Sequence, residues 1–123
     1  MAGIIFFTTR DLETIKDFYL NEVGAKAWLS QPDIEILAHD NFIFGFHLQN
    51  SVSKDVMLTF FYRTNDEVDV MYQRLKDIAT SAPKVSTKYN IYHFFAKDPE
   101  GRSIEFQHFL HDVPPIEGVN FTE

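Results

Sequence analysis

The chain has 123 residues, of which 45% are hydrophobic and 24% are charged, and this composition is typical of one globular domain with its own core. A formal net charge of −7 and 11 scattered Lys and Arg residues argue against nucleic-acid binding, which rests on clustered basic side chains. The absence of Cys excludes disulfides, thiolate nucleophiles and Cys-ligated zinc.

The first half of the chain predicts one helix and four strands. Residues 4–9, IIFFTT, are β-branched or aromatic and indicate a strand. Asp11 can cap a helix, which Gly24 is expected to end. The apolar stripe of this helix is expected to comprise Leu12, Ile15, Phe18 and Tyr19. Three further strands are expected over residues 25–30, 33–39 and 42–49, with turns at QPD and DN between them.

The second half of the chain repeats this order. Residues 56–63 indicate a strand, and Asp66 is expected to cap a second helix that is broken by SAP at residues 81–83. The apolar face of this helix is expected to comprise Val68, Met71, Leu75 and Ile78. Three strands are expected over residues 84–88, 91–97 and 103–109. The order β-α-β-β-β therefore occurs twice, in modules of about residues 3–50 and 54–110, before an irregular tail over residues 111–123.

The sequence contains no sign of a membrane segment or a secretion signal. No apolar run approaches the roughly 20 residues that span a bilayer. The first residues, MAGIIFFTTRD, lack the basic segment, the long apolar core and the cleavage site of a signal peptide. We therefore expect a cytoplasmic protein with neither a membrane nor a nucleic acid as its partner.

Three motifs within the repeat carry a family resemblance. They are DLETIKDFYLNEVGAKAW at residues 11–28, NDEVDVMYQRL at 65–75 and DPEGRSIEF at 98–106. Together they resemble the vicinal oxygen chelate superfamily, which includes glyoxalase I, extradiol dioxygenases, and fosfomycin- and bleomycin-resistance proteins. The resemblance covers about residues 3–110 and implies one glyoxalase/bleomycin-resistance-like domain of the α+β class. Its two βαβββ modules would form, with pseudo-twofold symmetry, a cup-shaped mixed sheet with helices on the outer face, usually in a homodimer.

Alternation along the predicted strands divides their side chains between two faces. The face packed on the helices is expected to carry Ile5, Phe7, Phe44, Phe46, Thr59, Phe61, Ile104 and Phe106. The other face is expected to carry Ile4, Phe6, Thr8, Ile43, Gly45, His47, Leu58, Phe60, Tyr62, Ser103, Glu105 and Gln107. This second set mixes apolar walls with a few polar groups, as ligand pockets do. A solvated face and a dimer surface are the alternatives to a pocket.

The resemblance also identifies positions at which metal-dependent members hold their metal. These positions are expected at Ile4, Gly45, Phe60 and Glu105, and only Glu105 can coordinate a cation. Because a divalent metal needs several N or O donors, we expect no metal and no other cofactor. A displaced site formed by His47, Glu105 and Gln107 is the alternative. The remaining histidines show no metal-type spacing and are expected to be ordinary surface or hydrogen-bonded residues; they are His39, His93, His108 and His111.

Three functions are compatible with these patterns. The first is a metal-free small-molecule-binding protein of the glyoxalase/bleomycin-resistance type, whose candidate ligand-binding residues are Phe6, Trp28, His47, Phe60, Tyr62 and Gln107. Aromatic faces and a carboxylate favour a planar or cationic ligand. The second is a glyoxalase-like lyase or isomerase that uses Glu105 as its catalytic general base, with or without the displaced metal site. The third is an interaction module whose concave face is filled by its own side chains or by a partner.

Overall fold

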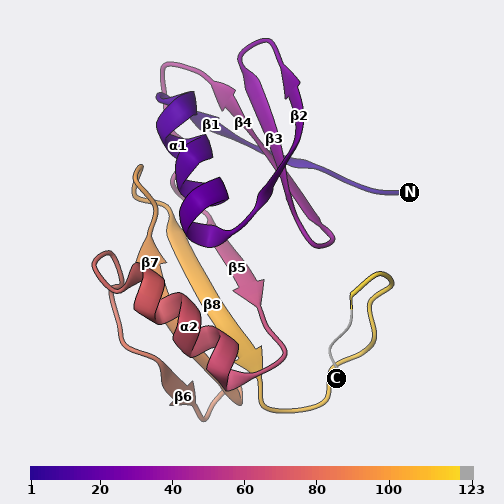
Figure 1. Cartoon of the computed structure of the whole chain (residues 1–123), viewed down its shortest axis with the longest axis vertical. Coiled ribbons are helices and arrows are strands. Elements are labelled where there is room, and N and C mark those ends of the chain that lie inside the picture. Colours follow the sequence, from indigo (N-terminus) through magenta and orange to yellow (C-terminus); the bar gives the residue numbers. More distant parts are fainter. Residues whose placement is uncertain (120–123) are drawn as a thin grey trace. The chain divides into compact units, whose positions relative to one another are not determined.

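The computed structural model describes residues 1–119 and divides the chain into two compact units, Met1–Asp55 and a second that begins at Val56 (Figure 1). The first unit contains β1 (Ile5–Thr9), α1 (Leu12–Phe18), the π-helix η1 (Tyr19–Val23), β2 (Lys26–Gln31), β3 (Ile34–His39) and β4 (Phe42–Leu48). The second contains β5 (Met57–Phe61), α2 (Asn65–Leu75), β6 (Lys84–Ser86), β7 (Ile91–Lys97) and β8 (Ser103–Phe109). The predicted α+β fold with two βαβββ modules is therefore confirmed.

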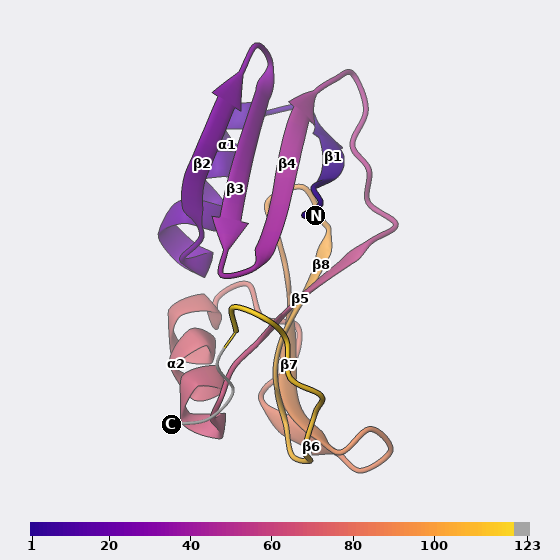
Figure 2. The same cartoon turned by 90° about the vertical axis from the view of Figure 1, so that its right-hand side faces the viewer.

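The first unit is a four-stranded mixed sheet with a helix on one face. Its strands lie in the order β1-β4-β3-β2, with β1 parallel to β4 and the other neighbours antiparallel. α1 packs against β3 and β4 and lies behind the strands in the view of Figure 2. The fully buried ring of Tyr19 lies 5.4 Å from the ring of Phe44 and 5.3 Å from that of Phe46. These three rings form the centre of the core of this unit.

The second unit repeats this arrangement. Its strands lie in the order β5-β8-β7-β6, and α2 packs against β7 and β8. The buried side of α2 consists of Val68, Met71 and Leu75. The ring of Tyr72 on α2 lies 5.4 Å from that of Phe94, which stacks 5.1 Å from that of Phe106. Phe94 and Phe106 therefore mark the face of the sheet that α2 covers, and we call the opposite face the open face.

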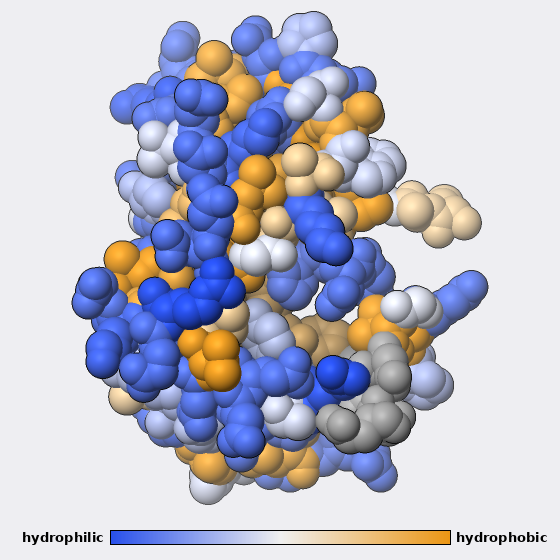
Figure 3. All heavy atoms as spheres, viewed as in Figure 1, coloured by the Kyte–Doolittle hydropathy of each residue, from blue (hydrophilic) through white to orange (hydrophobic). Residues whose placement is uncertain are grey.

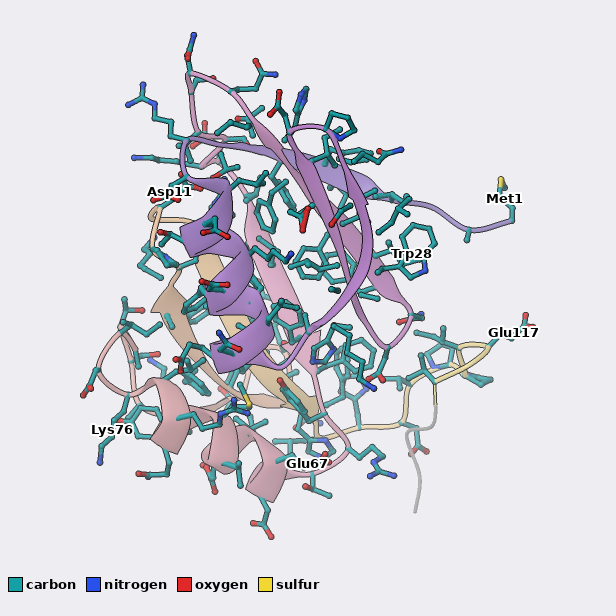
Figure 4. All side chains as sticks on the ribbon, turned by 45° about the horizontal axis from the view of Figure 1, so that its top comes forward. Met1, Asp11, Trp28, Glu67, Lys76 and Glu117 are labelled. Carbon is teal, nitrogen blue, oxygen red and sulfur yellow. The ribbon has the colours of Figure 1, made fainter. Side chains whose placement is uncertain are left out.

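The two helices begin with similar caps, one of which differs from the prediction. Asp11 accepts a hydrogen bond from the backbone N–H of Thr14, so the predicted cap of α1 is confirmed. The cap of α2 is Thr64 rather than Asp66, because the extended backbone at Thr64 lets its hydroxyl accept from the N–H of Glu67. Asp66 lies in the first turn instead. In Figure 4, Asp11 and Glu67 lie at the starts of their helices.

The helix ends were predicted with mixed success. Gly24 ends η1 with a φ of 94°, a left-handed conformation that favours glycine, so the predicted stop is confirmed. α2 ends at Leu75, before the predicted breaker at 81–83. Ile78 donates from its N–H to the carbonyl of Leu75 and is 37% exposed, so it is not part of the apolar face of the helix. Within residues 1–119, no helix has the length and apolarity needed to cross a membrane.

Strand register corrects one predicted face assignment. β5 pairs in parallel with β8, so that Thr59 lies opposite Glu105 and Phe60 opposite Phe106. Paired residues point to the same side of a sheet, and Thr59 therefore shares the open face with Glu105. The assignment of β5 to the two faces was wrong by one residue. Its sequence MLTFF is apolar on both sides, so alternation alone could not separate the two faces.

Candidate functional site

A buried carboxylate lies on the open face of the second unit. Glu105 on β8 is 7% exposed, and both of its oxygens accept a hydrogen bond. The hydroxyl of Thr59 donates to Oε1 at 2.8 Å. Nδ1 of His93, itself 7% exposed, lies 2.6 Å from Oε2. Thr59, His93 and Glu105 come from three adjacent strands and form the polar centre of the candidate site.

The turn between β7 and β8 sets the register that brings His93 to Glu105. Asp98 accepts through Oδ1 from the N–H groups of Glu100 and Arg102, and Nη1 of the fully buried Arg102 lies 3.1 Å from both Asp98 Oδ2 and Glu100 Oε1. Gly101 has a φ of 88°, which favours glycine at this point of the turn. The closed turn pairs β7 with β8 so that His93 lies opposite Gln107, diagonal to Glu105.

The contact with Glu105 fixes which nitrogen of His93 carries a proton. An ionised carboxylate only accepts hydrogen bonds, so Nδ1 is the donor in the pair. Nε2 is then the nitrogen that can accept a proton or, when protonated, donate to another group. The ring is also held at its side by Phe95, whose centroid lies 4.9 Å away with the planes at 64°. Glu105 therefore orients the imidazole and leaves Nε2 available for chemistry.

The open face is hollowed around this pair. A hollow of about 460 Å³ is lined by Met57, Tyr89, Ile91, His93, Phe95, Glu105, Gln107 and Phe109. Most of these side chains are apolar or aromatic, and the three polar ones at the floor are each 7% exposed: His93, Glu105 and Gln107. Apolar walls with a few convergent polar groups are the usual composition of a small-molecule site.

The predicted site residues on the second unit divide between its two faces. Gln107 lies on the open face with Glu105, as predicted. The ring of Phe60 stacks 5.6 Å from that of Phe106, and the ring of Tyr62 lies 6.4 Å from it. Both belong to the side that α2 covers, so their predicted position beside Glu105 was wrong.

The other predicted ligand-binding residues lie on the first unit. Phe6 on β1 is 49% exposed, and its ring lies over Gly45. Trp28 lies at a bulge of β2 and is 53% exposed (Figure 4). His47 on β4 lies within hydrogen-bond distance of the Gln49 side chain. The roles of Phe6, Trp28 and His47 as ligand-binding residues stay predictions, as does the displaced metal site that combines His47 with Glu105 and Gln107.

The positions predicted for a family-type metal also change. β1 begins at Ile5 and pairs Phe6 with Gly45, as β5 pairs Thr59 with Glu105. The corresponding positions are therefore Phe6, Gly45, Thr59 and Glu105, in place of a set with Ile4 and Phe60. Glu105 is the one strong ligand among them, and it is already bonded to Thr59 and His93. Within residues 1–119, no group of three or more His, Asp or Glu side chains could hold a metal ion. These residues do not fit a bound metal.

His93 is the residue of the candidate site that sequence reasoning missed. It was interpreted as an ordinary histidine because it has no metal-type spacing. A usable signal was present in the DPEGR turn, across which Lys97 pairs with Ser103. Counting outward from this pair along both strands places His93 opposite Gln107, on the face of Glu105.

Several solved structures resemble the chain over most of its length. A glyoxalase/bleomycin resistance protein/dioxygenase from Alicyclobacillus acidocaldarius superposes with a TM-score of 0.74 at 20% identity, covering 90% of this chain and 92% of that one. The chain has the glyoxalase/bleomycin-resistance fold. Lactoylglutathione lyase from Agrobacterium tumefaciens shares this fold, with a TM-score of 0.73 at 17% identity over 88% of this chain and 92% of that one. A glyoxalase/bleomycin resistance protein/dioxygenase family enzyme from Burkholderia phytofirmans also shares it, with a TM-score of 0.76 at 18% identity over 87% of this chain and 97% of that one.

Sequence comparison, unlike structure comparison, finds no similar protein. No protein-family model matches this chain, and no curated protein matches it in sequence. The fold that the resemblance implied is therefore confirmed by the solved structures.

Proposed function

We propose that the protein binds a small molecule with a planar, apolar body in the hollow on the open face of the second unit. One observation carries this proposal: three buried polar side chains, His93, Glu105 and Gln107, form the floor of an otherwise apolar hollow. The side chain of Gln107 makes no hydrogen bond to another residue of the described part of the chain, so its carboxamide can donate to and accept from a ligand. A ligand that bonds to this carboxamide could also stack between the aromatic walls.

Calorimetric titration against a panel of planar compounds tests this proposal. We expect saturable binding of one compound per site, and about tenfold weaker binding for Gln107→Leu, which has a similar volume but no hydrogen-bonding group. The matched control is Gln73→Leu, the same substitution on the exposed side of α2. If no compound gives heat, or if both variants bind as the wild type does, the hollow is not a ligand site and the interaction-module reading is favoured.

A second candidate function is proton transfer on a small carbonyl compound, as in glyoxalase-like lyases and isomerases. The 2.6 Å contact between His93 and Glu105 favours it, because a carboxylate bonded at Nδ1 orients the imidazole and leaves Nε2 to take up a proton. Both oxygens of Glu105 are occupied, so we assign the general base to Nε2 of His93 rather than to Glu105. Nε2 would take the proton from the carbon next to the carbonyl, and the developing oxyanion would accept from the Gln107 amide.

Deuterium exchange monitored by NMR tests this second function independently of turnover. Carbonyl compounds with an acidic C–H should exchange that proton with D₂O in the presence of protein, and the lactoylglutathione-forming reaction should be assayed in parallel with and without nickel, zinc or manganese. We expect His93→Gln to reduce exchange at least about 100-fold. His39→Gln, on the first unit, is the control and should leave it unchanged. Equal exchange in both variants would exclude His93 as the base.

Assembly and location stay predictions of the sequence. The family resemblance implies a homodimer, and analytical ultracentrifugation should then give about twice the chain mass of 14.3 kDa. A single species at the chain mass would contradict this. The expected cytoplasmic location is tested by fractionating cells that produce the protein and probing each fraction with an antibody.

A further inference from the structure

Three lysines lie beside residues that line the hollow of the second unit or share their face of the sheet. Lys84 on β6 pairs with His93, so its side chain lies on the open face. Lys97 on β7 donates from Nζ to the hydroxyl of Ser103 at 2.9 Å, on the same face. Nζ of Lys88 lies 5.3 Å from the ring centroid of Tyr89, which lines the hollow. All three lysines are exposed, and none makes an ion pair with another residue among those described.

The strands of this unit carry few acidic groups. Glu105 is the one acidic residue in strands β5 to β8, and its oxygens are bonded to Thr59 and His93 inside the sheet. Asp66 and Glu67 lie in the first turn of α2, over which Figure 3 shows mostly hydrophilic residues. Asp98 and Glu100 are paired with Arg102 in the turn before β8. Although the whole chain is acidic, the exposed charged side chains on strands β6 and β7 are therefore lysines, and we call Lys84, Lys88 and Lys97 the lysine rim.

The polar floor agrees with this rim. With Nδ1 of His93 bonded to Glu105, Nε2 can donate to an anionic oxygen when the ring is protonated. The carboxamide of Gln107 supplies N–H donors. Both oxygens of Glu105 already accept a hydrogen bond, so the polar group of a ligand is expected to contact Nε2 of His93 and the Gln107 carboxamide rather than the carboxylate.

We infer that the ligand of this hollow is an organic anion with a planar apolar body. Its body would lie against Phe95, Phe109 and Tyr89, and its anionic group would lie near the lysine rim. The inference rests on the proposed ligand-binding function and adds the sign of the ligand's charge. The net charge of the chain and the presence of Glu105, taken alone, would instead suggest a cation. Exposed ammonium groups contribute modestly and additively, and salt screens them.

Three probes with the same ring system and different charge test the inference. They are 2-naphthoate, 2-naphthylmethanol and 2-naphthylmethylammonium, titrated calorimetrically into the full-length protein at low salt. We expect 2-naphthoate to bind most tightly, and its affinity to fall as ionic strength rises. Lys84→Gln and Lys97→Gln should each weaken it about two- to fivefold, and the double variant about fivefold or more.

The matched control is Lys76→Gln, which removes the same charge at the end of α2 (Figure 4). It should change the affinity for 2-naphthoate less than twofold. Tighter binding of 2-naphthylmethylammonium or 2-naphthylmethanol would overturn the anion inference and leave the proposed ligand site standing. Equal effects of Lys84→Gln, Lys97→Gln and Lys76→Gln would overturn it as well. If none of the three probes binds, the proposed planar-ligand function fails together with the inference.

Discussion

The two units share one topology but carry different chemistry on their open faces. Gly45 on β4 occupies the position of Glu105 on β8, because Phe6 pairs with Gly45 as Thr59 pairs with Glu105. A Cβ at Gly45 would lie 2.6 Å from Cε1 of Phe6, so the ring of Phe6 fills the space that a side chain would need. The second unit has the Glu105 carboxylate and the Thr59 hydroxyl at these positions, whereas the first has the ring of Phe6 lying over the backbone of Gly45.

The next strand shows the same difference. Ile34 lies opposite His47 as His93 lies opposite Gln107, so the apolar Ile34 takes the place of the histidine that contacts Glu105. The helix-facing sides differ much less, with Phe44 and Phe46 in one unit and Ile104 and Phe106 in the other, all fully buried. Packing on the helix thus maintains the fold in both units, while the open face is free to become either an apolar surface or a polar site.

The largest expected effect on stability comes from the turn before β8, and the equivalent turn before β4 should contribute little. Arg102→Met leaves the buried Asp98 without its ion-pair partner, and we expect it to lower the free energy of unfolding by about 3–5 kcal/mol. In the first unit, Asp40 lies in the equivalent turn with its side chain 77% exposed. Asp40→Asn should therefore change stability by less than about 0.5 kcal/mol. Urea unfolding followed by circular dichroism measures both.

Fluorescence adds a local readout to that experiment. Trp28, the single Trp of the chain, lies on β2 and reports on the first unit. A loss below about 1 kcal/mol for Arg102→Met would show that the ion pair does not hold the turn.

A second prediction concerns the hydroxyl that supports the carboxylate. Thr59→Val keeps the shape of the side chain and removes the donor to Glu105, and we expect a loss of about 1.5 kcal/mol in the free energy of unfolding. In a Glu105→Leu background the same substitution should cost little, which a double-mutant cycle detects as a coupling energy. Thr87→Val, at an exposed turn residue, is the control. Additive effects of Thr59→Val and Glu105→Leu would contradict the assigned hydrogen bond.

A smaller effect is expected at the corresponding position of the first unit. Gly45→Ala forces the ring of Phe6 to move and should cost about 1 kcal/mol in the free energy of unfolding. In a Phe6→Ala background the added methyl has room, and Gly45→Ala should be neutral or stabilising, because Ala loses less backbone entropy than Gly on folding. Urea unfolding of the four proteins gives the coupling energy. A destabilisation that persists without the ring would place the constraint in the backbone instead.

Sequence patterns predicted the architecture better than the site. Strand spans, the repeat and the cap at Asp11 followed from local signals that the folded chain keeps. The cap of α2 was missed because Thr64 and Asp66 are both residue types that cap helices. The extended backbone conformation at Thr64, which the sequence does not reveal, makes Thr64 the cap. The face of Phe60 was missed because β5 is apolar on both sides.

The site could be predicted only in part, because it depends on pairing between strands. Glu105 and Gln107 share one strand, so alternation within that strand placed them together. His93 comes from another strand, and its contact with Glu105 depends on the register that the turn of residues 98–102 imposes. The lysine rim is likewise invisible in a net charge of −7, because the chain average hides where each sign lies.

The smallest expected effects are pH-dependent changes in stability, on the acidic side of neutrality in the first unit and at alkaline pH in the second. In the first, burial holds the pKa of His39 below its ordinary 6.5, so the unfolded chain binds more protons below that pH. Stability should be constant above about pH 6.5 and should fall as the pH decreases through the folded-state pKa. His39→Gln should remove this slope in unfolding measured between pH 7.5 and 5. An unchanged slope would assign it to another group.

In the second unit, a hydrogen bond of 2.6 Å to Asp69 raises the pKa of Tyr92 to about 12. The neutral phenol is favoured in the folded state, so its contribution to stability is complete below the ordinary pKa of 10 and is lost as the pH rises toward 12. Tyr92→Phe should therefore be less stable than the wild type near neutral pH and should approach it as the pH rises above 10. A constant difference between the two proteins up to pH 12 would show that this bond does not distinguish the two forms of the phenol. Because Tyr92 joins β7 to α2, this titration reports on helix packing in the unit that carries the site, whereas that of His39 reports on the first unit alone.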